Sequence, residues 1–238
     1  MPHLRIYILT ALLLLTGTVA AQEKMYLEPR LGFGTFRMSS MKELQQTVIS
    51  NTSVNAKAVD QFGPYFQFGL GLVQDLSDNT RAGLLVERGS TGGRVAYEDY
   101  SGEITFDTPV SYNALGIFLY THEPIAASKI ELVTGIELNL FLSRLKTESY
   151  ARIYDSKESS EDKFNSKGLG LKPYIGLQYP VFTLPVSLTA GYMASASQAF
   201  HVPGEKEQYL VRNADGDKLE PSWSGLRINL TVAVPLFD

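Results

Sequence analysis

The chain contains no cysteine, which excludes disulfides, thiol nucleophiles and metal sites with Cys ligands. A lipid anchor is excluded as well, since it needs a cysteine at the mature N-terminus. Positive charge is not in excess: Lys plus Arg number 21 against 25 for Asp plus Glu, a formal net charge of −4, so we expect no nucleic-acid partner. After residue 21 no apolar run approaches the roughly 20 residues of a transmembrane helix, which disfavours a helical membrane bundle.

The N-terminus has the three parts of a secretory signal peptide. Arg5 precedes the apolar stretch 6–15, and small residues fill positions 16–21. We expect cleavage after Ala21, with residues 1–21 as the signal peptide and 22–238 as one mature domain. The alternative is an uncleaved membrane anchor, for which the apolar run is short.

Segments of about ten residues with period-two alternation recur along the mature chain, as in tilted barrel strands. The clearest is 129–146, where Ile136, Leu138 and Leu140 alternate with Glu137 and Asn139. In 110–120 aromatic and aliphatic residues occupy both faces, so its orientation stays open. The expected strands are 26–37, 63–76, 80–88, 110–120, 129–146, 168–179, 186–197 and 224–237.

The connections between these strands alternate in length. Segments 38–62, 89–109, 147–167 and 198–223 are long, whereas 77–79, 121–128 and 182–185 are short. Outer-membrane barrels have this pattern because their periplasmic turns are tight and their exterior loops are free to grow. The sequence therefore predicts an all-β fold: a single closed antiparallel transmembrane β-barrel of about eight strands in the outer membrane, with short periplasmic turns, long extracellular loops and both termini in the periplasm.

Polar and charged residues lie on the strand faces opposite the apolar ones, and we expect them to point into the lumen. About eight strands leave an interior that side chains alone can fill, and opposite charges there can pair, so we predict a plugged barrel. Two alternatives remain: the charges line a proton or ion path, or the polarity is reversed around an apolar ligand pocket, as in lipocalins. The predicted lumen network consists of Glu28, Arg30, Gln67, Arg81, Glu87, Glu131, Glu137, Lys172, Arg227 and Asn229.

Three segments, together with the signal peptide, resemble the outer-membrane β-barrel domain family common in Bacteroidetes, including PorT-like proteins often labelled porin family. They are the opening Glu28-Pro29-Arg30-Leu31-Gly32-Phe33-Gly34, strand 112–120 followed by 129–143, and the closing Gly225-Leu226-Arg227-Ile228-Asn229-Leu230. The resemblance spans the mature chain and implies the barrel fold, in a family with diverse or unknown roles. It departs at the end, where Phe237 is out of phase with Leu236 and Val234, whereas similar proteins finish on an in-phase aromatic.

Catalytic signatures are weak. His122 lies in a predicted turn next to Glu123, and we expect a solvated turn there rather than a metal site. His201 could serve a lipid-modifying esterase with one of two serines and one of two acids, but such residues are ordinary in barrel loops. These candidates are Ser195 or Ser197 as the nucleophile and Glu205 or Glu207 as the orienting acid. We expect no catalytic residue, no metal and no cofactor.

Two polar segments and a set of aromatic residues also carry predictions. The oxygen-rich segment 213–220 lacks the full calcium-loop spacing and predicts a polar turn. The mixed-charge tract 152–163 predicts a mobile loop, or else a contact site for lipopolysaccharide or a protein. Aromatics near the strand ends predict interfacial girdles: Tyr65, Tyr112, Tyr120, Tyr150, Tyr179, Tyr192 and Trp223.

These patterns favour a non-enzymatic outer-membrane barrel with a plugged lumen. It would have a structural role, bind through its extracellular loops, or serve an envelope assembly. The expected partners are outer-membrane lipid and lipopolysaccharide, the barrel-assembly machinery and an envelope protein. A narrow pore or transport component is the second hypothesis, and a lipid-modifying enzyme is the third.

Overall fold

The computed structural model describes residues 24–100, 102–126, 128–205 and 208–236. The predicted signal peptide, its cleavage site after Ala21 and the aromatic Phe237 lie outside the described residues.

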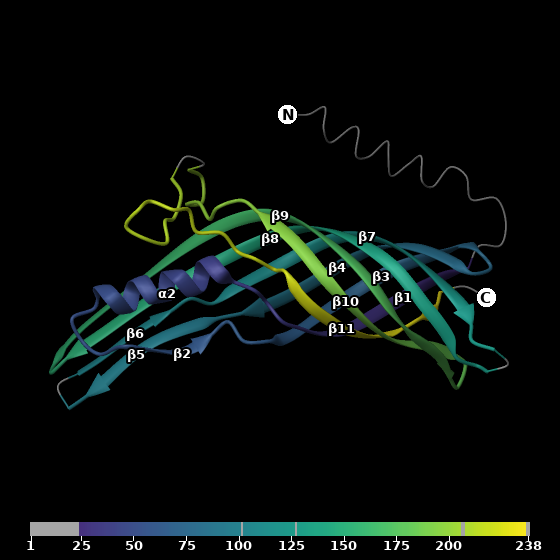
Figure 1. The fold of residues 1–238 in the computed structure, drawn as a ribbon, viewed down its shortest axis with the longest axis horizontal. Coiled ribbons are helices and arrows are strands. Elements are labelled where there is room, and N and C mark those ends of the chain that lie inside the picture. Colours follow the sequence, from purple (N-terminus) through teal and green to yellow (C-terminus); the bar gives the residue numbers. More distant parts are fainter. Residues whose placement is uncertain (1–23, 101, 127, 206–207, 237–238) are drawn as a thin grey trace.

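Eight antiparallel strands form a ring in which every strand pairs with two neighbours (Figure 1). The ring follows chain order, and the last strand pairs with the first, where Arg30 lies opposite Thr231. This confirms the predicted all-β barrel of eight strands. The strands are β1 (Met25–Gly34), β3 (Tyr65–Ser77), β4 (Thr80–Thr91), β7 (Val110–Pro124), β8 (Glu131–Ile153), β9 (Ser156–Val181), β10 (Leu184–Ser197) and β11 (Gly225–Val232). A short strand, β12 (Val234–Pro235), extends the pairing of the chain's end with β1.

The outer surface of the ring is a continuous apolar band. Side chains from adjacent strands, such as Ile117, Leu138 and Leu171, are 45–56% exposed, and the polar partners in the alternation point inward. A band of this extent is unfavourable in water but matches the lipid-facing surface of a membrane barrel. The fold is therefore a transmembrane β-barrel, and the lipocalin-like alternative, with the polarity reversed, is wrong.

The structure also decides the orientation of β7, which the sequence left open. Leu115, Ile117 and Leu119 face outward, whereas Tyr112 and the other aromatics of the strand are buried inside. A small residue on the neighbouring strand makes room for Tyr112: a Cβ added to Gly89 would lie 2.5 Å from its ring. Large inward side chains are thus accommodated by glycines across the ladder.

The two ends of the barrel differ. At one end, called here the turn end, tight connections at 78–79 and 182–183 join the strands, and the Leu236 N–H donates to the Met25 carbonyl at 2.9 Å. Both ends of the described chain therefore lie at the turn end (Figure 1). The opposite end, called the loop end, holds the long connections.

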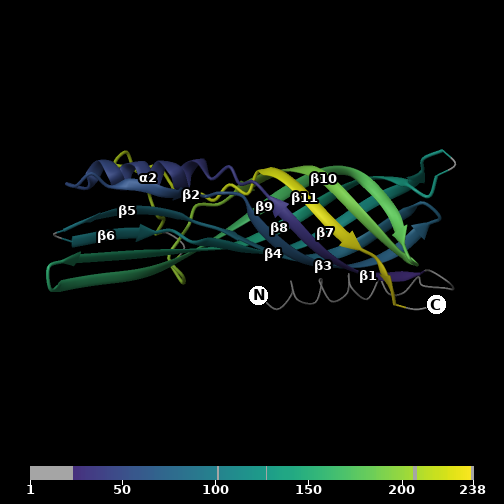
Figure 2. The same ribbon diagram turned by 90° about the horizontal axis from the view of Figure 1, so that it is seen from below.

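Three connections predicted as long loops are largely regular structure instead. Segment 38–62 holds α2 (Ser39–Asn51) and β2 (Lys57–Gln61), and 89–109 holds β5 (Gly93–Asp99) and β6 (Gly102–Asp107). Strands β8 and β9 run on through 147–167 as a hairpin beyond the barrel. The outer parts of β8 and β9 and the strands β6, β5 and β2 form a sheet in the order β9-β8-β6-β5-β2, called here the projecting sheet (Figures 1 and 2).

The mixed-charge tract 152–163 lies in this projecting sheet, so the prediction of a mobile loop there is wrong. Its ladder is unbroken from the Ile153–Ser156 pair inward to the barrel. Both faces of this hairpin are polar, so the alternation in polarity that identifies a half-buried strand is missing from its sequence. Ion pairs replace apolar contacts, as where Lys146 lies 2.6 Å from Glu148 and 2.7 Å from Glu161.

Helix α2 packs against the projecting sheet with Met41 and Gln45 buried. Its Gln45 amide donates to the carbonyl of Asp60 on β2 at 2.9 Å, which ties the helix to that strand. No helix in the described part of the chain is long and apolar enough to cross a membrane.

We predict that Leu138→Arg destabilises the barrel by about 2–4 kcal/mol, because it places a charge in the middle of the lipid-facing band. The control Ser159→Arg, on the exposed projecting sheet, changes the free energy of unfolding by less than about 0.5 kcal/mol. The measurement is urea unfolding from lipid vesicles, followed by fluorescence of Trp223, the only tryptophan. Equal effects of the two variants would contradict a lipid-facing position for Leu138.

Candidate functional site

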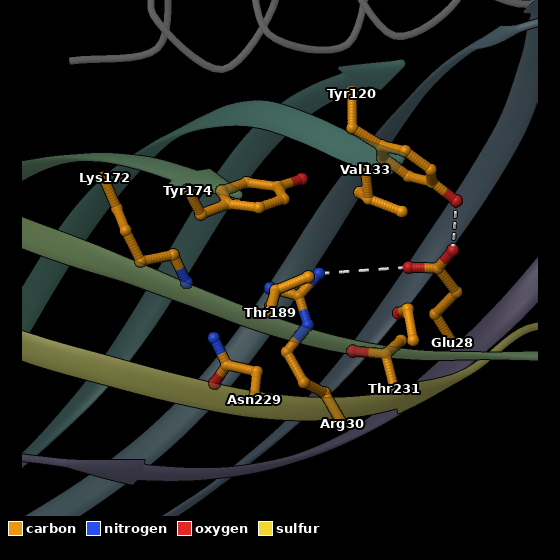
Figure 3. A pocket seen from close by; sticks show the side chains of 10 residues that line it. Glu28, Arg30, Tyr120, Val133, Lys172, Tyr174, Thr189, Asn229 and Thr231 are labelled. Atoms are coloured by element: carbon orange, nitrogen blue, oxygen red, sulfur yellow. Dashed lines mark hydrogen bonds and ion pairs between the residues drawn. The ribbon is translucent and has the colours of Figure 1, made fainter. Parts of the chain in front are cut away.

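The centre of the lumen is a cluster of four charged side chains, Glu28, Arg30, Glu137 and Lys172, called here the charge cluster. Glu137 on β8 is fully buried and accepts from Arg30 of β1 at 2.7 Å and from Lys172 of β9 at 2.8 Å. Arg30 also lies 3.9 Å from Glu28, which accepts a hydrogen bond from the Tyr120 hydroxyl at 2.6 Å (Figure 3). Two cations and two carboxylates balance one another in a site from which water is largely excluded.

Register alone places two members of this cluster together. Glu137 and Lys172 are opposite residues of the β8–β9 ladder, and both point inward. Arg30 and Glu28 reach them from β1, which is not a neighbour of either strand, so the contact crosses the lumen. The charge cluster therefore links opposite walls of the barrel.

A second polar group lies toward the loop end. The Tyr112 hydroxyl is 2.8 Å from Gln67 and 2.6 Å from Glu87, and the Gln67 amide reaches Asn229 at 3.4 Å. Arg227, 1% exposed, donates to the backbone carbonyls of Thr35 and Trp223 and stacks on the Phe36 ring at 4.6 Å. These contacts join the strand walls to the segments that cover the mouth.

The turn end has its own polar contacts. Arg81 pairs with Asp75 at 2.6 Å and lies over the Tyr26 ring. His122 is buried on β7 and lies 3.2 Å from Glu131, so the prediction that it sits in a solvated turn is wrong. The reason is that β7 runs on to Pro124 and keeps its inward alternation, which carries position 122 into the lumen.

A hydrophobic cluster closes the loop end and is called the mouth cluster. Its centre is Trp223, whose indole N–H donates to Ser143 at 2.8 Å and whose ring packs 4.5 Å from Tyr112. Two connections, the one between β1 and β3 and the one between β10 and β11, contribute residues to it, as do the strands. Its buried members are Phe36, Met38, Met41, Phe62, Val110, Tyr112, Ala114, Phe141, Leu145, Met193, Phe200, Leu219 and Trp223.

The predicted aromatic girdle is only partly correct. Tyr65, Tyr179 and Tyr192 are 48–55% exposed on the outside, where they can contact the membrane interface. Tyr112, Tyr120 and Trp223 are instead buried inside, and Tyr150 lies on the projecting sheet. The inward aromatics occur because an eight-stranded barrel must fill its lumen with side chains.

Little space remains in the centre. The cavity beside the charge cluster, lined by Glu28, Arg30, Lys172 and Tyr174 among others, has a volume of about 20 Å³ (Figure 3). That is room for about one water molecule. The described residues thus leave the middle of the lumen filled.

The structure places the predicted lumen residues as follows. All except Glu131 are buried, and Glu131 sits half-exposed at the turn end, where it also accepts from Gln178 at 2.6 Å. They divide between the charge cluster, the Tyr112 group, Arg227 near the mouth and two pairs at the turn end. Sequence reasoning missed Tyr112, Tyr120 and Asn139 as members; the hydroxyls on 110–120 were the available signal, but the face of that strand was undecided.

The candidate esterase residues do not form a triad among the described residues. The Ser195 hydroxyl lies 3.2 Å from that of Ser224, and His201 forms backbone bridges to Asn165 and Tyr209. Glu205 is exposed, and Glu207 lies outside the described residues. In the described part of the chain no group of three or more His, Asp and Glu side chains is placed to hold a metal. In the segment 213–220 the Asn213 side-chain amide donates to the Asp217 carboxylate at 3.0 Å.

These features define the class: a transmembrane β-barrel of eight strands whose lumen is filled by paired charges and capped by a hydrophobic mouth cluster. No protein-family model and no curated protein matches the chain.

Several solved structures are similar to it. Neisserial surface protein A is 14% identical, with 90% of this chain and 99% of that one covered and a TM-score of 0.39. The outer membrane protein OprG from Pseudomonas aeruginosa is 11% identical, with 90% and 96% covered and a TM-score of 0.46. The N-terminal β-barrel domain of Pseudomonas aeruginosa OprF is 10% identical, with 90% and 99% covered and a TM-score of 0.26.

We predict that Glu137→Gln destabilises the barrel by about 3–5 kcal/mol, because it leaves Arg30 and Lys172 buried without their shared carboxylate. The double variant Glu137→Gln/Lys172→Gln removes one charge of each sign and recovers part of that loss. Glu158→Gln, on the exposed projecting sheet, is the control and leaves the urea midpoint unchanged. A double variant no more stable than Glu137→Gln alone would show that the charge balance does not govern the cluster.

Proposed function

We propose that this protein is an integral outer-membrane barrel that conducts no solute, has no enzymatic role and acts through its projecting sheet as a binding surface outside the cell. The observation that carries the proposal is the combination of a filled lumen with a large ordered structure beyond the membrane band. A filled lumen removes the usual use of a barrel as a channel. The barrel then serves to anchor the part that projects.

The outer-membrane location is supported by the closed ring of strands with an apolar exterior and by the predicted signal peptide. The tight connections of the turn end match periplasmic turns, so the loop end would face outward. The barrel-assembly machinery would be the partner that inserts the chain.

The projecting sheet has the size and exposure of an interaction surface. The β8 segment 143–153 alone is roughly 35 Å of strand at about 3.3 Å per residue. Two exposed tyrosines, Tyr100 at 97% and Tyr154 at 73%, stand at neighbouring hairpin tips, where Gly102 pairs with Ile153. Tyrosine is enriched in protein interfaces, and β2, whose partner in the described sheet is β5, offers an open edge for another strand. An envelope or extracellular protein is the partner this surface fits.

We predict that the loop end faces the outside of the cell and the turn end faces the periplasm. Labelling of single introduced cysteines tests this, and the chain suits it because it has no cysteine of its own. Asp215→Cys, on the last loop, reacts with an impermeant maleimide on intact cells. Thr183→Cys, at the turn end, reacts after the outer membrane is permeabilised. The reverse pattern would place the projecting sheet in the periplasm, and absence of the protein from the outer-membrane fraction would end the proposal.

We predict that a partner shields the hairpin tip in cells. Asp155→Cys, in the β8–β9 turn, should react several-fold more slowly on intact cells than in purified protein, since a bound partner excludes the reagent, as interfaces exclude water. Asp215→Cys is the control and reacts at equal rates in both. Equal rates at both positions would contradict a bound partner at the tip.

We predict no discrete conductance steps from the wild-type protein in planar bilayers, because the charge cluster and the mouth cluster together occupy the lumen. A porin reconstituted in the same lipid provides the positive control. Reproducible ohmic steps from the wild type would favour the alternative, a narrow pore or transport component.

A further inference from the structure

The apolar band ends abruptly on one side of the barrel, on strands β4, β7, β8 and β9. The last fully apolar row across these strands is Val86, Leu115, Leu140 and Leu169. Two residues further toward the loop end, about 7 Å along the strands, the row is Arg88, Asn113, Leu142 and Lys167. The next row is Ser90, Ser111, Arg144 and Asn165. Cations, amides and hydroxyls therefore replace aliphatic side chains within two steps of the alternation, and Leu142 is the last aliphatic residue in these rows.

Three of these side chains form what is called here the basic patch: Arg88, Arg144 and Lys167. None of them has an acidic partner within ion-pair distance among the described residues. In that part of the chain Arg88 donates to the Asn113 side chain at 3.5 Å. Arg88 and Arg144 lie on either side of β7, two strand spacings apart and offset by two residues along the strands, which separates their backbones by roughly 12 Å. Two long guanidinium side chains at that separation can reach one anion between them.

The surface is hollowed at the basic patch. One hollow of about 330 Å³ is lined by Arg88, Arg144 and Lys167 together with Ser111 and Asn113. A second, of about 600 Å³, adjoins it, and Arg88, Ser111 and Arg144 line both. Hollows of this size accommodate small polar molecules, and here the lining combines cations with hydroxyl and amide donors.

Three of the cations further out, on the projecting sheet, are paired with carboxylates. Lys146 and Lys163 lie 2.7 and 3.0 Å from Glu161, and Arg152 lies 3.9 Å from Glu103. Hydrogen bonds from Lys146 and Lys163 lower the pKa of the Glu161 carboxyl, so that it stays ionised. Two of the three cations in the tract 152–163, where the sequence suggested a lipopolysaccharide contact, are thus paired, whereas none of the three cations at the edge of the apolar band has such a partner among the described residues.

We propose that the basic patch binds the phosphate groups of a phosphorylated glycolipid in the outer leaflet, with Arg88 and Arg144 clamping one phosphate and Lys167 reaching a second group. The lipid source follows from position: the patch adjoins the apolar band, where the acyl chains of such a lipid can pack against Leu140 and Leu169 while its phosphates meet the cations. The binding chemistry is independent of any protein partner, although its relevance in cells rests on the proposed outer-membrane location.

The test is native mass spectrometry of the purified mature protein in detergent, titrated with bisphosphorylated lipid A or with its fully dephosphorylated form. We expect the wild type to prefer the phosphorylated lipid, and Arg88→Gln/Arg144→Gln/Lys167→Gln to bind it about tenfold or more weakly, since charge-assisted hydrogen bonds are lost. The matched control, Lys57→Gln/Lys129→Gln/Lys157→Gln, removes the same charge from exposed positions elsewhere and binds as the wild type does.

Unchanged heat-modifiability on a gel verifies that the triple variant retains the folded barrel. Equal binding by the patch variant and the control, or equal binding of the two lipid forms, would overturn the proposal. Complete displacement of the lipid by millimolar inorganic phosphate would indicate a site for free phosphate instead of lipid. Because this measurement is made on purified protein, its failure is distinguishable from a failure of the outer-membrane location, which cell fractionation reports.

Discussion

The lack of hydrogen-bonding solvent inside a bilayer is the constraint on which the rest of the structure depends. Every backbone N–H and C=O in the membrane must find a partner within the sheet, so the ladder returns from β11 to β1 and leaves no edge at membrane depth. Closure with eight strands then fixes the width of the interior. Alternate side chains of every strand are forced into that narrow space, and the polar ones among them must satisfy each other. The contact of Glu137 with both Arg30 and Lys172 is a direct consequence.

A lumen filled in this way stabilises the barrel and determines what it can do. Tyr120 and Tyr112 occupy volume and also hydrogen-bond the carboxylates Glu28 and Glu87, so that aromatic and charged residues share the interior. Above them Trp223 and its neighbours cover the loop end, held to the wall by the bond to Ser143. A channel would require many of these contacts to break together. The surfaces that remain accessible lie outside the lumen, on the projecting sheet and at the edge of the apolar band.

These two outer surfaces differ in charge pairing. On the projecting sheet Lys146, Glu148 and Glu161 neutralise one another across strands, which suits a surface that must be ordered without a hydrophobic core of its own. At the edge of the band Arg88, Arg144 and Lys167 have no ion-pair partner among the described residues. The same two strands, β8 and β9, contribute to both surfaces, and their continuous ladder connects the membrane band with the tip of the hairpin.

The sequence by itself determined the barrel, because lipid outside and polar groups inside impose period two on every membrane-spanning strand, as in the alternation of Leu138 and Leu140 with Glu137 and Asn139. It also indicated which polar residues face inward, since those positions follow from the same alternation. The sequence did not reveal the projecting sheet: water contacts both faces of the hairpin around Ile153, so no polarity pattern marks it as a strand. The face of β7 was undecided for a related reason, since Phe118 is as apolar as Leu115 and Ile117, and Tyr112 adds a large apolar ring to the same face as Phe118. Only the tertiary structure decided which inward residues meet, because Arg30 and Glu137 lie on strands that do not pair, and the distance across the lumen depends on how the whole ring closes.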